Sequence, residues 1–456
     1  MNYLQALKTI KEIESNYDIL AIKFKSIPIW PYLRIYLFDS LLESHRAQGY
    51  TGSNIKRVLK SVFYYNPIPL FKHYKIWIIG DTADRKFIDG KYQQSITGAI
   101  PQICDDYIEL ERPYNNPVHY KRNLIKEKRV VSFSIVYLLS HVIEILLRIN
   151  TPSIQNEEVL RKILRENDIS FNYNYYIRYF YGQYLAMKLL CKISAAPRAA
   201  ILICPYTIMG CVRALKEYGT HIIEMQHGVI NKKHFAYTGT YRTDELFPDE
   251  LCVFGDEEYQ MFTSDDIPYC KNVHKTGLYI LDESLRCFKD DIFKKYRTRF
   301  TQIVVLAGQV TTDNRFIPFF SNLANMLPEV LFVYIPRGVP DVQPIKEKEN
   351  LIYRAGVNIY EYLKWCDVHC TVSSTTCLEA HYFRKPTIFY NLNQLAESYY
   401  SSLLKDRNGV YYIDTEESFI KALRDIQKNE VFEYKQLYAK DGYVELSNLL
   451  KKYAKH

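Results

Sequence analysis

Residues 368–390 read V-H-C-T-V-S-S-T-T-C-L-E-A-H-Y-F-R-K-P-T-I-F-Y, and this stretch decides the fold class. It opens with a short apolar run, 368–372, and a second apolar run, 387–391, follows Lys385-Pro386. Between the two runs lie a cluster of hydroxyl residues and a segment of helical character. Short buried apolar strands that are separated by helices are typical of a parallel sheet. The stretch therefore predicts a strand–helix–strand unit of an α/β domain.

The hydroxyl cluster consists of Ser373, Ser374, Thr375 and Thr376, and it falls where the first strand should pass into the helix. The first turn of a helix presents unpaired backbone N–H groups and the positive end of the helix dipole, which suit a phosphate. Glu379 follows one turn further along the same helix face, where a carboxylate would bind a ribose diol. The cluster thus predicts half of a nucleotide site.

The alternation of strands and helices continues on both sides of this stretch. Further apolar runs predict strands at 303–310, 331–335, 356–360 and 410–413. The charged segment 282–299 comes before them and marks the best domain boundary. We therefore expect a Rossmann-like, nucleotide-binding domain over 296–430, which is an ordinary size for a domain.

The N-terminal part of the chain combines helices with a second set of strands. Residues 1–70 and 121–195 are expected to be mainly helical, and 85–92 is expected to be a loop. Strands are expected at 75–84, 106–112, 198–204, 220–228, 251–256 and within 273–282.

The predicted fold class is α/β, with two Rossmann-like domains that face each other across a cleft and a mainly helical N-terminal extension. The first domain would cover 1–285, and the final helix, within 431–456, would pack back on it. In such folds the ligand lies in the cleft, at the carboxyl ends of the strands.

Composition and charge narrow the partners. The 456 residues are 48% hydrophobic and 24% charged, which is typical of a globular protein with room for two cores. The net charge of +8 comes with no nucleic-acid recognition motif, so no nucleic-acid partner is expected. Basic residues in 121–129 precede an apolar run, 130–147, and this pairing fits an anionic membrane surface.

The run 130–147 does not predict a membrane span, because His141 and Glu144 would be costly in hydrocarbon. No signal peptide is visible, since the first residues are typical of an amphipathic helix. We expect a cytoplasmic protein, peripheral at the inner membrane.

The ten cysteines are scattered and form no C-x-x-C pair, which indicates reduced, mostly buried thiols. Cys366, His369 and Cys370 lie close in sequence but lack a matching second pair, so no zinc site is expected. The sequence predicts neither a metal site nor a cofactor.

A second informative stretch is Gln226-His227-Gly228, at the end of the strand expected over 220–228. His227 would act as a general base near neutral pH, or as a cation beside a phosphate. Gly228 would allow a close backbone approach or a positive φ. His234 and Tyr237 follow as weaker candidates, for which a structural role is equally expected.

With Phe254-Gly255-Asp256 and Lys275-Thr276-Gly277-Leu278 further on, these motifs resemble bacterial surface-polysaccharide glycosyltransferases of the GT-B architecture, which build O-antigen or capsule. The resemblance runs loosely over residues 75–395, and its donor motif matches 373–386. It implies a nucleotide-sugar donor, a lipid-linked saccharide acceptor and chemistry without an obligatory metal. It also implies that domain 1–285 is the acceptor side and that domain 296–430 binds the donor nucleotide.

Position by position, the resemblance implies that Ser373 to Thr376 hold the donor phosphate and that Glu379 holds the donor ribose. His227 would face the reaction centre, and Gln309 would lie in a loop that contacts the donor. Relatives that use CMP-activated sugars carry His-Pro where this chain has Ile335-Pro336-Arg337, so Arg337 would instead grip a diphosphate.

The reaction needs a base for the acceptor hydroxyl, with His227 as the first candidate. Asp81 and Asp84, at the end of the strand expected over 75–84, are the second candidates. Inversion and retention stay open.

Three other readings stay open: a CDP-polyol phosphotransferase of the teichoic-acid type, a sugar-nucleotide epimerase, and a polysaccharide-assembly scaffold without turnover. The long helical N-terminal region argues against the epimerase, and Glu379 weakly favours the sugar nucleotide over the CDP-polyol.

Overall fold

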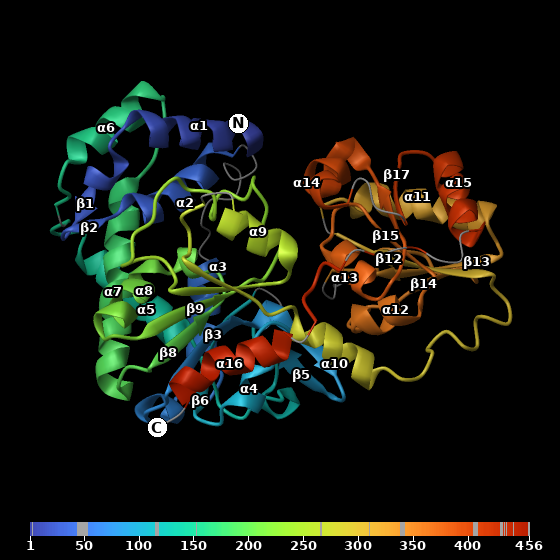
Figure 1. Ribbon diagram of the computed structural model, residues 1–456, viewed down its shortest axis with the longest axis horizontal. Coiled ribbons are helices and arrows are strands. Elements are labelled where there is room, and N and C mark those ends of the chain that lie inside the picture. Colours follow the sequence, from blue (N-terminus) through green and yellow to red (C-terminus); the bar gives the residue numbers. More distant parts are fainter. Residues whose placement is uncertain are drawn as a thin grey trace. The chain divides into compact units, whose positions relative to one another are not determined.

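Two parallel sheets organise the chain in the computed structural model (Figure 1). The structure describes residues 1, 3–42, 53–114, 118–151, 153–264, 267–309, 311–337, 343–404, 409–428, 432, 434, 436–440 and 442–454. The first unit consists of Met1–Arg85, Tyr92–Gly277 and Lys440–His456, and the second unit consists of Lys86–Lys91 and Leu278–Ala439. Val310, the last residue of one predicted strand, lies outside the described residues.

The first unit has a seven-stranded sheet in the order β11-β10-β9-β8-β3-β6-β7, and every neighbouring pair is parallel. Its strands are β3 (Ile76–Asp81), β6 (Tyr107–Arg112), β7 (Val130–Ser132), β8 (Ala199–Leu202), β9 (His221–Met225), β10 (Glu250–Val253) and β11 (Asn272–Lys275). The central strands are apolar and buried because helices cover the sheet.

Helices make up most of the rest of the first unit. They are α1 (Tyr3–Asn16), α2 (Trp30–Leu41), α3 (Ser53–Val62), α4 (Ile100–Ile103), α5 (Ser134–Leu146), α6 (Glu157–Glu166), α7 (Tyr173–Ser194), α8 (Met209–Glu217), α9 (Asp256–Ser264) and α16 (Gly442–Ala454). The longest helix, α7, packs against both α5 and α8. The close approach of α5 depends on Gly182, where an added Cβ would lie 2.4 Å from the Ser140 carbonyl oxygen.

The second unit has a six-stranded parallel sheet in the order β14-β13-β12-β15-β16-β17. Its strands are β12 (Gln302–Ala307), β13 (Val330–Ile335), β14 (Leu351–Tyr353), β15 (Val368–Thr371), β16 (Thr387–Tyr390) and β17 (Val410–Ile413). Its helices are α10 (Tyr279–Cys287), α11 (Asp313–Met326), α12 (Ile359–Trp365), α13 (Thr376–Tyr382), α14 (Leu395–Leu404) and α15 (Glu416–Lys428). The prediction of two parallel α/β domains with helical N-terminal additions is confirmed.

Two predicted elements are wrong. The strand expected at 356–360 is instead the start of α12, because Asn358 caps that helix by accepting a hydrogen bond from Tyr360 N at 3.0 Å. The loop expected at 85–92 is instead a hairpin of β4 (Arg85–Ile88) and β5 (Lys91–Gln94). Its two-residue turn, Asp89-Gly90, has the positive φ angles of 55° and 74° that tight hairpins require.

A buried ion cluster fixes the base of this hairpin. The Arg85 guanidinium is fully buried and pairs with three buried carboxylates, those of Glu109, Glu111 and Glu127. The distance from Arg85 Nη2 to Glu109 Oε1 is 2.7 Å. Buried charges are tolerated when they are paired and hydrogen-bonded in this way.

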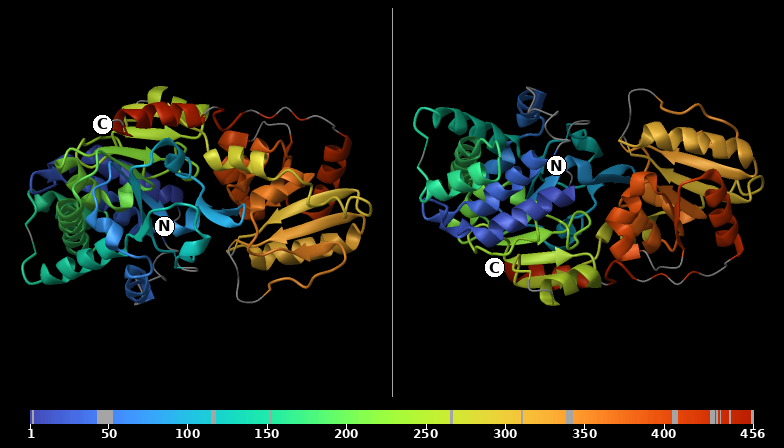
Figure 2. Two further views of the ribbon diagram at one scale, coloured as in Figure 1. Left: turned by 90° about the horizontal axis from the view of Figure 1, so that it is seen from below. Right: turned by 90° about the horizontal axis from the view of Figure 1, so that it is seen from above.

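The last helix, α16, returns to the first unit, where Figure 2 shows it in red, and it packs on α4 and the edge strand β11. Glu445 lies 2.9 Å from His274 Nδ1 of β11, and the Tyr453 ring stacks on His221. The backbones come so close that a Cβ on Gly442 would lie 1.8 Å from the Thr276 carbonyl oxygen.

Candidate functional site

The carboxyl ends of β9, β8, β3 and β6, which are neighbours in the first sheet, bring four side chains together. Arg112 ends β6, Asp81 ends β3, Cys204 follows β8 and His227 follows β9. Arg112 Nη2 donates to Asp81 Oδ2 at 2.5 Å and to the Ile203 carbonyl oxygen at 2.9 Å. The pair holds the Asp81 carboxylate at the edge where α/β folds place ligands.

His227 is half-buried beside this ion pair. The Cys204 sulfur lies 3.3 Å from His227 Nδ1 and 3.1 Å from Nε2, so it does not select one tautomer. Burial, reinforced by the positive charge of Arg112, lowers the pKa of His227 to about 4, and Asp81 opposes this shift. The imidazole is therefore neutral near pH 7 and has a nitrogen that can accept a proton.

Cys204 and Asp84 complete this edge. Burial raises the pKa of the Cys204 thiol to about 12, and the negative charges of Asp81 and Asp84 raise it as well. Cys204 also has a left-handed backbone, with φ at 50°, which is uncommon for a residue with a side chain and occurs most often at functional sites. Asp84 ends the short 3-10 helix Thr82–Asp84, directly after β3.

Gln226 positions the loop that carries His227. Its side chain is buried and makes three internal hydrogen bonds. Nε2 donates to the Gly228 carbonyl oxygen at 2.8 Å and to Glu258 at 3.0 Å, while Oε1 accepts from Phe254 N at 2.7 Å. A Cβ on Gly228 would meet nothing within 4 Å, which leaves room for a ligand to approach the backbone.

The two weaker candidates lie behind His227. The Tyr237 side chain is fully buried, and its hydroxyl donates to Glu224 Oε1 at 2.8 Å. Tyr269 donates to the other Glu224 oxygen at 2.6 Å. Burial raises the pKa of Glu224 to about 7. Burial lowers the pKa of the half-buried His234 to about 4, and its interaction with the neighbouring His227 also lowers it. Tyr237 thus has a structural partner.

In the second unit, the hydroxyl turn connects β15 to α13. Gln309, which follows β12, braces the turn through its side-chain oxygen, which accepts from Ser373 N at 2.8 Å and from Ser373 Oγ at 3.2 Å. The next bonds are longer: Ser374 N donates to Thr371 Oγ1 at 3.4 Å, and Thr376 N donates to Ser374 Oγ at 3.3 Å. The structure thus brings Gln309 and Ser373 together.

The hydroxyls of the turn differ in their surroundings. Thr375 is exposed, whereas Ser373, Ser374 and Thr376 are half-buried. The Thr376 hydroxyl lies 3.0 Å from Nε2 of His369, whose other ring nitrogen lies 3.2 Å from the Thr387 hydroxyl. Burial lowers the pKa of His369 to about 3, so a neutral imidazole ties α13 to the sheet.

Glu379 lies on α13, one turn beyond the cluster. Tyr360 donates to Glu379 Oε1 at 3.2 Å. Burial raises the pKa of Glu379, while Lys86 and the Tyr360 hydrogen bond oppose the rise. Lys86 also lies 6.0 Å from the centre of the Tyr360 ring, within the second unit. Arg337, by contrast, is exposed just after β13.

Several of these neighbours were not predicted from the sequence. Arg112 and Cys204 had a usable signal, because each ends or follows a strand whose carboxyl end reaches the same sheet edge as Asp81. Tyr360, Lys86 and His369 had no such signal, since only the folded chain brings them to Glu379 and Thr376. Among the described residues, no group of three or more His, Cys, Asp or Glu side chains could hold a metal ion.

Comparisons with known proteins give a coarse result. No protein-family model matches the chain, and no curated protein matches it by sequence. Solved structures match by fold, among them a UDP-GlcNAc 2-epimerase from Methanocaldococcus jannaschii. Its TM-score is 0.49 at 8% identity, over 83% of this chain and 99% of that chain.

Two further solved structures are similar at the same level. The wall teichoic acid polymerase TagF gives a TM-score of 0.46 at 10% identity, over 92% of this chain and 98% of that chain. The glycosyltransferase SnogD from Streptomyces nogalater gives 0.43 at 9% identity, over 84% and 99%. Scores and identities this low identify neither a substrate nor an activity for this chain.

No described helix is long and apolar enough to cross a membrane.

Proposed function

We propose that this protein is a glycosyltransferase that moves a sugar from a nucleotide-sugar donor to a lipid-linked saccharide acceptor in surface-polysaccharide synthesis, at the cytoplasmic face of the membrane. One observation carries the proposal. It is the placement of a neutral His227 beside the Asp81–Arg112 ion pair at the carboxyl edge of the first sheet.

His227 suits the acceptor half of such a reaction. The acceptor hydroxyl gives its proton to an imidazole nitrogen, and its oxygen forms a bond to the anomeric carbon of the donor sugar. The bond from that carbon to the nucleotide phosphate breaks, and the phosphate leaves with the electron pair. Asp81 and Asp84 are the alternative bases, and Asp81 also stabilises the imidazolium that forms.

The hydroxyl turn suits the donor half. A leaving phosphate would be stabilised by backbone N–H groups at the start of α13, since preorganised dipoles act strongly on developing charge. The bonds from Ser374 N and Thr376 N are long, at 3.4 and 3.3 Å, so a phosphate oxygen would readily replace them. Glu379 would hold the ribose and Arg337 the diphosphate.

Nucleotide release tests the proposal. The full chain is incubated with UDP-, GDP-, CMP- and CDP-activated donors and a lipid-linked saccharide in detergent, with and without EDTA. We expect release with one of the sugar nucleotides, and we expect it to persist in EDTA. Release with none of the donors would refute the proposal, and the active donor names the nucleotide.

His227→Ala links release to the site. We expect turnover to fall by about 100-fold or more, because a general base contributes about 10²–10⁴-fold. The matched control is His73→Ala, since His73 is exposed and lies outside the site. Equal turnover of the His227→Ala protein and the unchanged chain would show that His227 is not the base. A scaffold without turnover would release no nucleotide with either protein, and polysaccharide made in the cell would be unchanged by His227→Ala.

The same reactions separate the other two alternatives. A CDP-polyol phosphotransferase would release CMP from a CDP-polyol and leave phosphate on the acceptor, which phosphorus NMR detects. An epimerase would invert C2 of UDP-GlcNAc without an acceptor, which proton NMR of the recovered sugar nucleotide detects. Either product would replace the glycosyltransferase assignment.

A further inference from the structure

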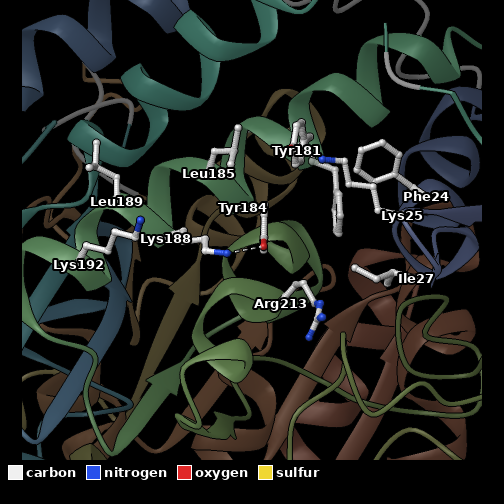
Figure 3. Close-up of a pocket in the computed structure, with 11 residues that line it drawn as sticks. Phe24, Lys25, Ile27, Tyr181, Tyr184, Leu185, Lys188, Leu189, Lys192 and Arg213 are labelled. Carbon is white, nitrogen blue, oxygen red and sulfur yellow. Dashed lines mark hydrogen bonds between the residues drawn. The ribbon is translucent and has the colours of Figure 1, made fainter.

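A groove of about 510 Å³ lies on the first unit (Figure 3), and its lining includes none of the four residues of the His227 edge. The β1–β2 turn, α7 and α8 form it, where β1 is Lys23–Phe24 and β2 is Ile27–Pro28. Four cations line it: Lys25 from the turn, Lys188 and Lys192 from α7, and Arg213 from α8. The groove is therefore strongly basic.

Three of the four cations keep capacity for an anion. Lys188 is the exception, because it pairs with Glu217 at 2.5 Å and donates to the Tyr184 hydroxyl at 3.0 Å. Lys192 is exposed. Lys25 Nζ donates to the Tyr181 hydroxyl and lies 4.0 Å from the centre of the Tyr181 ring, so further N–H donors of its ammonium group remain available. No described residue accepts a hydrogen bond from the buried Nε of Arg213.

The rest of the lining is apolar or aromatic. Tyr181, Leu185 and Leu189 follow one another at four-residue spacing along α7, so they form a stripe beside the cations. Leu189 is 46% exposed, and Ile193, one turn further, is 47% exposed. An exposed apolar stripe beside a row of Lys residues is the pattern of a helix that lies at a membrane interface.

The lining also argues against other ligands. None of its described residues has a carboxylate or an amide, which are the groups that read sugar hydroxyls and nucleobases. The cations instead match a phosphate, and the apolar stripe matches an acyl chain.

The turn that presents Lys25 is strained. Lys25 and Ser26 both have positive φ angles, 47° and 68°, in a two-residue hairpin turn where Asn-Gly would be relaxed. Strain of this kind persists most often where a side chain has a function.

We propose that this groove binds the phosphate head of an anionic phospholipid at a bilayer surface, with the acyl chain along Tyr181, Leu185 and Leu189. The site rests on the proposed function only in that a lipid-linked acceptor would bring the protein to a membrane. The groove would be the surface that holds the first unit at the membrane.

Vesicle co-sedimentation of the full chain tests the site. Vesicles of phosphatidylcholine are compared with vesicles that also contain phosphatidylglycerol, without any donor or acceptor. We expect binding to the anionic vesicles that weakens as salt is added. Lys192→Gln/Arg213→Gln should bind about 25-fold more weakly, because each basic residue near an anionic surface contributes about 5-fold.

The matched control is Lys451→Gln/Lys452→Gln, which removes the same charge from exposed positions of α16. It should bind as the unchanged chain does. Lys25→Gly should bind about 5-fold more weakly while its thermal midpoint stays equal or rises, since the substitution removes a charge and relieves the strained turn. Leu189→Asn should weaken binding without changing the charge.

Three results would overturn the site. They are equal binding to both kinds of vesicle, unchanged binding of Lys192→Gln/Arg213→Gln, and equal losses in the α16 control. Binding to phosphatidylcholine vesicles only after a polyprenyl phosphate is added would replace the phospholipid as the occupant. Because the transferase assay uses a detergent-solubilised acceptor, failure of the proposed function would leave the vesicle result intact.

Discussion

At the scale of single residues, the surroundings of His227 predict how activity responds to pH. A base must be unprotonated to accept the acceptor proton, so activity is lost as pH falls through its pKa. With that pKa lowered to about 4, we expect the acid limb of kcat/KM near pH 4 rather than near pH 6.5. The measurement is a pH profile of nucleotide release, with fluorescence to confirm that the protein stays folded.

Two variants should move this limb in opposite directions. Arg112→Gln removes a positive charge and should raise the pKa of His227, which shifts the limb to higher pH. Asp81→Asn removes an opposing negative charge and should shift the limb to lower pH. Limbs that stay in place in both variants would show that His227 is not the base.

Gln309 gives a second prediction at this scale. Gln309→Glu keeps the oxygen that accepts from Ser373 N and Ser373 Oγ, but it adds a negative charge beside the turn. We expect donor KM to rise by about 10-fold or more, with little change in thermal stability, because like charges repel a phosphate. A matched Gln309→Ala protein should lose stability as well, since it loses both hydrogen bonds.

Much of the His227 edge could be predicted from sequence, because polar residues at the ends of parallel strands meet at one edge. His227 and Asp81 were found in this way. The sequence could not predict that the side chains of Gln226 and Tyr237 bond to other residues of the protein. In sequence, a buried polar side chain with internal partners cannot be distinguished from one that faces a ligand. Thr376 was predicted from its hydroxyl, but its partner His369 depends on strand pairing.

At the scale of elements, the contact between α5 and α7 predicts a large effect from one methyl group. Gly182→Ala would place a Cβ 2.4 Å from the Ser140 carbonyl oxygen, so the helices must separate. We expect a loss of about 1–3 kcal/mol in the free energy of unfolding, which is typical of overpacking. Urea denaturation measures it.

Gly228→Ala is the matched control. A Cβ there meets nothing within 4 Å, so stability should stay within about 0.5 kcal/mol. Turnover should fall, because the methyl group would occupy space next to His227 that we assign to the ligand. A stable and fully active Gly228→Ala protein would argue against a close backbone approach.

Most strands of both sheets were predicted, because most of the buried parallel strands are short apolar runs. The short strands β7 and β14 were not predicted. The failures have specific causes. Asp89-Gly90 is a strong hairpin signal, but the charged residues around it led to the prediction of a loop. One of them is Arg85, whose carboxylate partners come from distant parts of the chain. At 356–360 the apolar residues predicted a strand, but Asn358 caps a helix that begins at Ile359.

At the scale of the whole molecule, Glu224 couples folding to pH. Its pKa is raised from 4.5 to about 7 in the folded state, so its stabilising contribution is present at low pH and is lost as pH rises through 7. The quantity to follow is the free energy of unfolding of the unchanged chain minus that of the Glu224→Gln protein. We expect this difference to fall by about 2 kcal/mol between about pH 5 and pH 7.5. Urea denaturation at the two pH values measures both terms.

The comparison with Glu224→Gln isolates this group because other titrating side chains contribute equally to both proteins. The amide that replaces the Glu224 carboxyl would still offer an oxygen to Tyr237 or Tyr269, so the fold should survive. A difference that is constant with pH would show that Glu224 is ionised in the folded protein throughout this range.

The return of α16 has a consequence for biosynthesis. The helix α16 covers the edge strand β11 of the first unit. It leaves the ribosome about 160 residues after that strand, because the whole stretch Leu278–Ala439 of the second unit is made between them. At about 5–20 residues per second, this interval lasts roughly 10 to 30 seconds. During it an unpaired strand edge is open to other nascent chains, so this protein should depend on chaperones while it is being made, and less so when it is refolded from the complete chain.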